Sequence, residues 1–303
     1  MPPAPAHTPI YPQLLQPNSN VRIVAPSGPV ERTSLMEGVQ ALDFPCHTSD
    51  EIYEVDGFWA GSRSHRKYTM QQAIDDPSAS AIWCARGGFG LTTILDDISF
   101  HALTSHPKWI IGNSDITALL LYLWAHYHLC TIHGPMAARF AQYPQIDIAA
   151  LHHILTFGPD TRKCTLKPVR AGVATGPLIG GNLTMLAHMM GTLPREFAMG
   201  CILLLEDVAE APYRLERHLI QLSRCGIFRQ ISGIILGEFT HCSPGSDGVT
   251  VETILKRNLS SLPIPVASGY PAAHGARNRP FIHGHPVSLT VTDRSASLVE
   301  AYL

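Results

Sequence analysis

The segment Lys108–Leu129, "KWIIGNSDITALLLYLWAHYHL", joins two apolar blocks through a glycine and a short polar cluster. The first block has the composition of a strand, and the second block, "ITALLLYLWA", that of a helix. A strand that ends at a glycine and turns directly into a helix can hold a side-chain oxygen clear of the surface. Ser114 stands at this turn, so the turn raises the question of what its hydroxyl does.

Two interpretations of Ser114 follow from this window alone. Asn113, Ser114, Asp115 and Thr117 are all of the residue types that cap helices, so a capping role is favoured at first. The alternative is a nucleophile on a sharp turn, although the stretch lacks the second glycine of a G-x-S-x-G elbow. A nucleophile would also need a base and an orienting acid elsewhere in the chain.

Two further stretches follow the plan of a short apolar run that ends in glycine. "VRIVAPSGP" covers 21–29 and "ASAIWCARGGFG" covers 79–90, and the segments between the strands have helical composition, as in "RSHRKYTMQQAIDD". This alternation predicts an α/β fold with an open parallel sheet and helices on both faces. Because ligands collect beyond the carboxyl ends of such strands, we expect Gly28, Gly88 and Ser114 to lie near one another.

The chain changes character at about Gly158. The stretch "GPDTRKCTLKPVRAGVATGP" has prolines, glycines and basic residues, which is typical of a linker or of a first edge strand. Helical and strand segments follow, including "GNLTMLAHMMGTL" with Asn182 as a helix cap, and the chain closes with the β pair "HPVSLTVTDRSASLVE". We therefore predict an N-terminal α/β domain over 1–160, a linker over 161–177 and a smaller C-terminal α/β domain over 178–303.

The composition narrows the class of partner. A formal net charge of −2 over 303 residues gives no general attraction to nucleic acid or to an anionic membrane. The longest apolar run is about half the length of a membrane helix, and the N-terminal stretch does not resemble a secretory signal. The seven cysteines are scattered, so reduced, mostly buried thiols are expected. These features predict a cytoplasmic protein that acts on small molecules, without nucleic-acid or membrane partners.

Two motifs that suggest bound groups are weak. "CARGGFG" lacks the Lys and Ser/Thr of a P-loop and the spacing of a dinucleotide fingerprint. His126, His128 and His133 have no carboxylate or cysteine pair at ligand spacing, so side-chain packing is favoured over a metal site. We therefore predict neither a metal nor an organic cofactor.

Candidates for a base and an acid follow two strands of the second half. Glu206 comes where the apolar run of "CILLLED" stops, and His274 lies in the glycine-bounded turn of "ASGYPAAHGARNRP". The order Ser, Glu, His is that of α/β-hydrolases, although such triads are recognised by geometry rather than by order. Structural alternatives remain open here: Glu206 could be a solvated strand end, and His274 a loop imidazole bonded to backbone.

The chain as a whole resembles the LD-carboxypeptidase family of serine peptidases. The blocks "AIWCARGGFG", "IIGNSDITALL", "LIGGNLTMLAHMMGT", "LLLEDVAEAPYRLERHLIQLSRCGIF" and "GYPAAHGARNRPFIHG" occur in the order found in that family. The family contains the muramoyltetrapeptide carboxypeptidases and the microcin C self-immunity peptidases.

The resemblance implies a role for each candidate. Ser114 would be the nucleophile, His274 its general base, and Glu206 the carboxylate that orients His274 and stabilises its charged form. Backbone N–H groups of Gly88 and Asp115 would form the oxyanion hole, which agrees with the freedom of a glycine turn to approach a carbonyl oxygen. The resemblance further suggests a homodimer, and in this scheme the active site lies between the two domains.

The expected substrate is a small peptide or muropeptide. The resemblance implies hydrolysis of the L,D bond that releases the terminal D-Ala from murein tetrapeptide stems during cell-wall recycling. Arg86, Arg277 and Arg279 are candidates for binding the terminal carboxylate, because a guanidinium binds a carboxylate bidentately. Asn113 stands where the family often has an aromatic residue, so we expect it to affect the wall of the substrate pocket.

Two alternatives remain. A self-immunity peptidase would use the same triad to cleave an aminoacyl or peptidyl nucleotide toxin. A non-catalytic two-domain binding protein would leave Ser114 and His274 unlabelled by fluorophosphonate or chloromethyl ketone probes.

Overall fold

The computed structural model describes residues 8–161, 163–272 and 274–301. The chain forms two compact units. The N-terminal unit comprises Pro9–Gly158 together with Arg279–Ile282, and the C-terminal unit comprises Pro159–Asn278 and the described residues from His283 onward. The short return segment at 279–282 means that neither unit is a single uninterrupted stretch of chain.

A six-stranded sheet forms the centre of the N-terminal unit, with the strand order β11-β5-β4-β3-β1-β2. The pairs β1–β2, β1–β3, β3–β4 and β4–β5 are all parallel, as the alternating pattern predicted. The strands are β1 (Asn20–Val24), β2 (Cys46–His47), β3 (Ala79–Cys84), β4 (Trp109–Gly112), β5 (Thr131–His133) and β11 (Phe281–His283).

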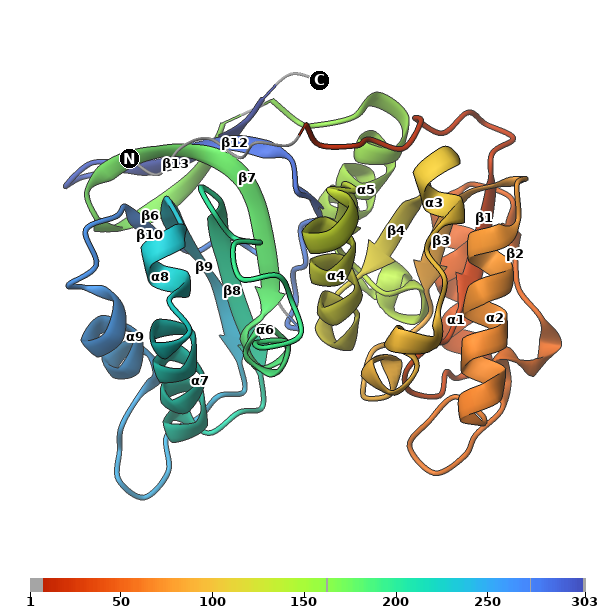
Figure 1. Cartoon of the computed structure of the whole chain (residues 1–303), viewed down its shortest axis with the longest axis horizontal. Coiled ribbons are helices and arrows are strands. Elements are labelled where there is room, and N and C mark those ends of the chain that lie inside the picture. Colours follow the sequence, from red (N-terminus) through yellow and green to blue (C-terminus); the bar gives the residue numbers. More distant parts are fainter. Residues whose placement is uncertain (1–7, 162, 273, 302–303) are drawn as a thin grey trace. The chain divides into compact units, whose positions relative to one another are not determined.

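The helices of this unit pack against the sheet through alternate strand residues. Ala81 and Trp83 belong to a buried cluster with residues of α1 and α5, whereas the neighbouring Ile82 is equally buried but lies outside that cluster. Figure 1 shows β3 and β4 between α4 and α2 in that view. The α-helices are α1 (Arg32–Leu42), α2 (Arg63–Asp75), α3 (Ala102–Ser105), α4 (Thr117–Tyr127) and α5 (Gln145–Phe157).

The C-terminal unit is built on a closed barrel with the strand order β10-β6-β13-β12-β7-β8-β9. Strand β7 is parallel to β8 but antiparallel to β12, so it joins the parallel and antiparallel parts of the barrel. The predicted β pair at the end of the chain is confirmed as β12–β13. The strands are β6 (Cys164–Arg170), β7 (Gly172–Asn182), β8 (Ile202–Val208), β9 (Gly233–Thr240), β10 (Val266–Ser268), β12 (Pro286–Val291) and β13 (Ala296–Glu300).

Residues 161–177, predicted as a linker, are strand from Cys164 onward except at Ala171. Strand β6 pairs with both β10 and β13, and the first half of β7 pairs with β12. Of the two alternatives for this stretch, a linker or a first edge strand, the structure has a strand. Most β6 side chains are exposed, so the strand has no apolar run that would distinguish it from a linker. Pro168 lies opposite Ala267, next to a register shift that interrupts the ladder.

The predicted cap of the first helix in the C-terminal unit is confirmed. Asn182 caps α6 (Leu183–His188) by accepting a hydrogen bond from the backbone N–H of Met185, 3.0 Å away. Helix α7 (Pro212–Arg224) has proline in its first turn and is followed by Gly226 at a φ of 82°. The other helices are α8 (Ile227–Gln230) and α9 (Val251–Leu259).

Candidate active site

Ser114 lies on a strained turn directly after β4. Asn113 is extended, and Ser114 has a φ of 56°, in the left-handed region that non-glycine residues rarely adopt. A single 3₁₀ turn (Ser114–Ile116) then leads into α4. Such backbone conformations cost about 1–3 kcal/mol and cluster at active sites. The turn therefore has the geometry of a nucleophile elbow although the sequence lacks the G-x-S-x-G pattern.

The capping interpretation of this turn finds little support. Asn113 precedes the 3₁₀ turn and Ile116 precedes α4, and neither makes a side-chain capping hydrogen bond. Ser114 occupies the first position within the turn rather than the capping position. The side chain of Asp115 bonds to the loops that carry Ser27 and Leu91, so it does not cap α4.

The glycine loop after β3 lies against Ser114. A Cβ placed on Gly87 would stand 2.8 Å from the Cβ and 3.0 Å from the Oγ of Ser114, so only glycine fits there. Gly88 has a φ of 104°, and a Cβ on it would be 3.5 Å from the Cα of Gly28. The N–H of Gly28 donates to the carbonyl of Gly87 at 2.9 Å. The predicted proximity of Gly28, Gly88 and Ser114 is confirmed.

Asp115 ties this loop to the nucleophile turn. Its side chain is buried, and its Oδ2 accepts hydrogen bonds from the Ser27 hydroxyl at 2.6 Å and from the Leu91 N–H at 3.0 Å. Burial raises the pKa of the Asp115 carboxyl, while the hydrogen bonds from Ser27, Leu91 and Gly90 and the charge of Arg66 act in the opposite direction.

The substrate-contact candidates of this unit differ in exposure. Asn113 is buried, with 4% of its surface exposed. Arg86 is exposed and donates a hydrogen bond from Nη1 to the Pro29 carbonyl at 2.8 Å. Phe89 is also exposed, and its ring centroid lies 5.9 Å from that of Phe58. The surface next to the glycine loop thus offers one cation and two aromatic rings.

Glu206 and His274 form an ion pair or hydrogen bond within the C-terminal unit. Glu206 is completely buried near the end of β8, and its Oε2 lies 2.9 Å from Nδ1 of His274, whose side chain is 14% exposed. The alternative of a solvated strand end is therefore wrong for Glu206, and the neighbouring Asp207 is also buried, with 2% of its surface exposed. Glu206 thus stands where an acid that orients the imidazole of a general base would stand.

The electrostatics of Glu206 reflect two opposing causes. Burial raises the pKa of its carboxyl, and the hydrogen bonds and charge of His274, together with a hydrogen bond from Asn182, partly offset that rise. A carboxylate in this setting interacts strongly with the imidazolium form of His274, because little water screens the pair.

Asn182 is a site residue that the sequence pattern revealed only as a cap. Its Nδ2 donates to Oδ1 of Asp207 at 2.9 Å, and its side chain also hydrogen-bonds Glu206. Asn182 lies opposite Glu206 in the parallel register of β7 and β8, which places the two side chains together. In the sequence, the only sign of this role is that β7 and β8 both carry a polar residue near their ends. That sign can be interpreted only once the two strands are known to pair.

The histidines considered as metal ligands pack on aromatic rings instead. The ring centroids of His126 and Tyr122 are 4.3 Å apart, those of His128 and Trp124 5.4 Å, and His133 stacks on Phe281 at 4.9 Å. This confirms the packing interpretation. Across residues 8–161, 163–272 and 274–301, no group of three or more His, Cys, Asp or Glu side chains could hold a metal ion.

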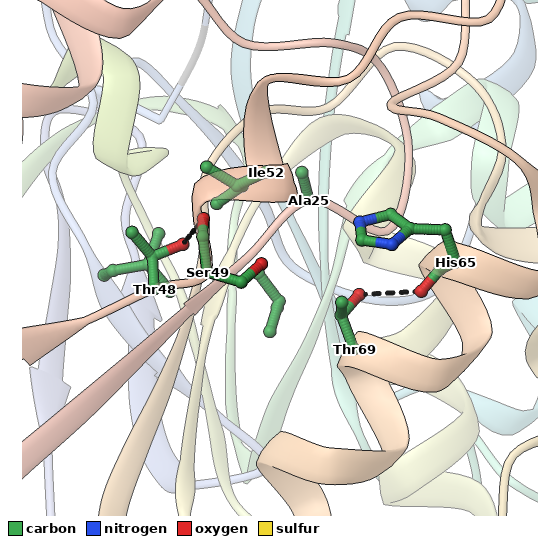
Figure 2. A pocket seen from close by; sticks show the side chains of 8 residues that line it. Ala25, Thr48, Ser49, Ile52, His65 and Thr69 are labelled. Carbon is green, nitrogen blue, oxygen red and sulfur yellow. Dashed lines mark hydrogen bonds between the residues drawn. The ribbon is translucent and has the colours of Figure 1, made fainter.

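Two threonines that line a small pocket in the N-terminal unit make local hydrogen bonds (Figure 2). Its polar side chains include Thr48, Ser49, His65 and Thr69. The Thr48 hydroxyl donates to the Ser49 carbonyl at 3.4 Å, and the Thr69 hydroxyl donates to the His65 carbonyl at 3.0 Å. These threonine hydroxyls therefore stabilise the segments that carry them. No described helix is both long and apolar enough to cross a bilayer.

A serine on a left-handed strand-to-helix turn, a glycine loop beside it and a buried carboxylate–imidazole pair are the groups that serine hydrolases use. Family comparison narrows this class. The chain belongs to the LD-carboxypeptidase family, because the model of the family's N-terminal domain matches residues 21–134 and that of its C-terminal domain matches residues 175–289. The molecule is thus a carboxypeptidase with the two-domain α/β architecture of that family.

Individual relatives match over nearly the whole chain. The murein tetrapeptide carboxypeptidase of Pseudomonas aeruginosa is 34% identical over 288 residues, covering 88% of this chain and 92% of the relative. The crystal structure of a muramoyltetrapeptide carboxypeptidase from Oxalobacter formigenes has a TM-score of 0.83 at 27% identity, covering 93% and 99% of the two chains. The microcin C7 self-immunity protein MccF, in complex with aspartyl sulfamoyl adenosine, shares the fold with a TM-score of 0.86 at 23% identity, covering 97% and 100%.

Proposed function

We propose that this protein is a cytoplasmic serine carboxypeptidase that hydrolyses the L,D bond of murein tetrapeptide stems and releases the terminal D-Ala during cell-wall recycling. The observation that carries the proposal is the 2.9 Å contact between fully buried Glu206 and His274. The similarity to the P. aeruginosa murein tetrapeptide carboxypeptidase supports this substrate class.

The proposed triad combines Ser114 with the Glu206–His274 pair. The Oγ of Ser114 attacks the carbonyl carbon of the scissile bond, and its proton passes to His274. Because Nδ1 of His274 faces Glu206, the proton moves through Nε2. The Glu206 carboxylate stabilises the resulting imidazolium, in an environment where burial strengthens that interaction.

The tetrahedral intermediate carries negative charge on the former carbonyl oxygen. In this proposal the backbone N–H groups of Gly88 and Asp115 donate to that oxygen, and each such donor contributes about 3–4 kcal/mol to transition-state stabilisation. Collapse of the intermediate breaks the C–N bond, and His274 returns the proton to the departing amine of D-Ala. Water then attacks the acyl-enzyme by the reverse sequence and releases the tripeptide.

The terminal carboxylate and the assembly complete the proposal. Arg86 keeps guanidinium N–H groups beyond the one that bonds Pro29, and these suit a carboxylate. Asn113 contributes to the pocket that distinguishes a D-residue from an L-residue on the leaving side. We expect a homodimer, which sedimentation or light scattering on the full chain would measure.

The test is a digest of four matched stems that end in D-Ala, L-Ala, D-Ala amide or D-Ala-D-Ala, followed by mass spectrometry. Efficient release from the first stem alone supports the proposal, and a Ser114→Ala variant serves as the inactive control. The amide should be a poor substrate, because a charge-assisted contact contributes about 1.5–3 kcal/mol. Equal cleavage of the L-Ala stem contradicts the proposal. Hydrolysis of an aminoacyl sulfamoyl adenosine without cleavage of any stem would instead indicate a self-immunity peptidase.

A further inference from the structure

The side chain of Asp115 joins loops that follow three different strands. Asp115 itself follows β4, the Ser27 hydroxyl that donates to it follows β1, and the Leu91 N–H that donates to the same oxygen follows β3. The Gly90 N–H is a further donor to this carboxylate. A single buried carboxylate thereby connects the carboxyl ends of the three adjacent strands β1, β3 and β4.

The loop held in this way needs an external restraint. Gly88 and Gly90 have φ values of 104° and 151°, which glycine adopts freely. Because glycine has no side chain, neither residue can fix its own backbone through side-chain contacts. A restraint on Gly90 and Leu91 limits the directions in which the nearby Gly88 N–H can point. Ser27 is itself fixed, because its carbonyl accepts a hydrogen bond from the Ala60 N–H at 2.9 Å.

Burial of the Asp115 carboxylate costs free energy of desolvation, which calls for a functional reason. An acidic side chain that is 1% exposed loses most of its hydration, and three donors offset that loss only in part. The nearby Arg66 guanidinium donates to the Gly61 carbonyl at 2.7 Å and to the Thr93 hydroxyl at 3.1 Å, so these two donors serve other acceptors. An apolar residue would fill the same space without that cost of desolvation.

We propose that the Asp115 carboxylate and the Ser27 hydroxyl form a clamp. This clamp positions the Gly88 N–H beside Ser114, where the N–H can donate to the oxyanion. The inference rests on the proposed function, since it assigns Gly88 to the oxyanion hole. An oxyanion donor acts mainly in the transition state, so loss of the clamp lowers kcat and leaves KM nearly unchanged.

The first measurement is steady-state hydrolysis of the D-Ala stem by Asp115→Ala, Asp115→Asn and Ser27→Ala. Asparagine keeps an acceptor oxygen for the loop N–H groups and adds a donor for Ser27, so it should rescue the alanine variant. We expect kcat to fall about 100-fold in Asp115→Ala, and about 10-fold or less in Asp115→Asn and Ser27→Ala, with KM within about threefold. Asp147→Asn is the matched control, because Asp147 is a fully buried carboxylate in the first turn of α5 in the same unit.

The second measurement is the rate at which a fluorophosphonate labels Ser114, because the P=O oxygen of the probe needs the same donors. This rate should fall in parallel with kcat while thermal unfolding and circular dichroism show a folded protein. Labelling needs no peptide, so the clamp is tested even if the wild type cleaves no murein stem. Should Asp115→Ala fail to fold, the same comparison is made between Ser27→Ala and Asp115→Asn.

Two results would overturn the inference. One is a folded Asp115→Ala variant whose kcat and labelling rate stay within about twofold of wild type. The other is an equal loss of kcat in Asp147→Asn, because that would show a general effect of disturbing the core of the unit.

Discussion

Burial disfavours the ionised form of Glu206, and the contacts with His274 and Asn182 offset only part of that free-energy cost. We predict that Glu206→Gln lowers kcat by about 10³–10⁴-fold, less than Ser114→Ala does. The amide lacks the charge that stabilises the imidazolium, and its N–H₂ group can hold His274 in the wrong tautomer. Steady-state kinetics on the D-Ala stem measure this, and a variant with wild-type kcat would exclude Glu206 from the triad.

The same substitution tests the raised pKa of Glu206 through stability. Because burial raises that pKa, the folded chain holds the Glu206 proton more tightly than the unfolded chain does. As pH rises from about 4.3, the ordinary pKa of glutamate, through the raised pKa of the folded state, Glu206 therefore destabilises the fold increasingly. Gln carries no such cost. The Tm of Glu206→Gln relative to wild type should rise between pH 4 and pH 8, and a constant difference would contradict the raised pKa.

At the scale of elements, the C-terminal end of helix α2 is bound by a buried lysine, Lys108, which lies just before β4. Nζ of Lys108 donates to the carbonyls of Ala73 at 3.2 Å, of Ile74 at 2.6 Å and of Asp76, and only 2% of Lys108 is exposed. Lys108→Met leaves these carbonyls without a charged donor, so we expect the free energy of unfolding to fall by about 1.5–3 kcal/mol. Urea denaturation measures the change. The exposed Lys256→Met in α9 is the control and should stay near wild type.

Strand β9 makes room for both Glu206 and the segment before His274. A Cβ on Gly237 would stand 2.6 Å from the Ala272 carbonyl and 3.0 Å from the Cβ of Glu206. Gly237→Ala should therefore displace the pair and lower kcat at least about tenfold, as small misplacements of catalytic groups do. Gly245→Ala is the control, because its nearest neighbour would be 3.8 Å away. Equal kcat in the two variants would show that the pair tolerates the displacement.

The strand-to-helix turn at Ser114 and the parallel sheet could be predicted because both depend on local sequence. The left-handed φ of Ser114 and its contact with Gly87 could not, since Gly87 lies in a loop that follows another strand. Strand β6 could not be distinguished from a linker because its side chains are mostly exposed, and its ladder partners β10 and β13 lie about 100 or more residues further along the chain. The role of Asn182 likewise appears only when β7 and β8 are paired.

At the scale of the whole molecule, strand β11 (Phe281–His283) occupies one end of the N-terminal sheet, beside β5 (Thr131–His133). All other strands of that sheet are complete by residue 133. On a translating ribosome that adds about 5–20 residues each second, β5 therefore precedes its partner by roughly 7–30 s. During that interval the nascent sheet presents β5 as an open edge, available to a strand of another chain. Because β11 comes so late in the chain, this sheet can be completed only after residues 281–283 have been synthesised.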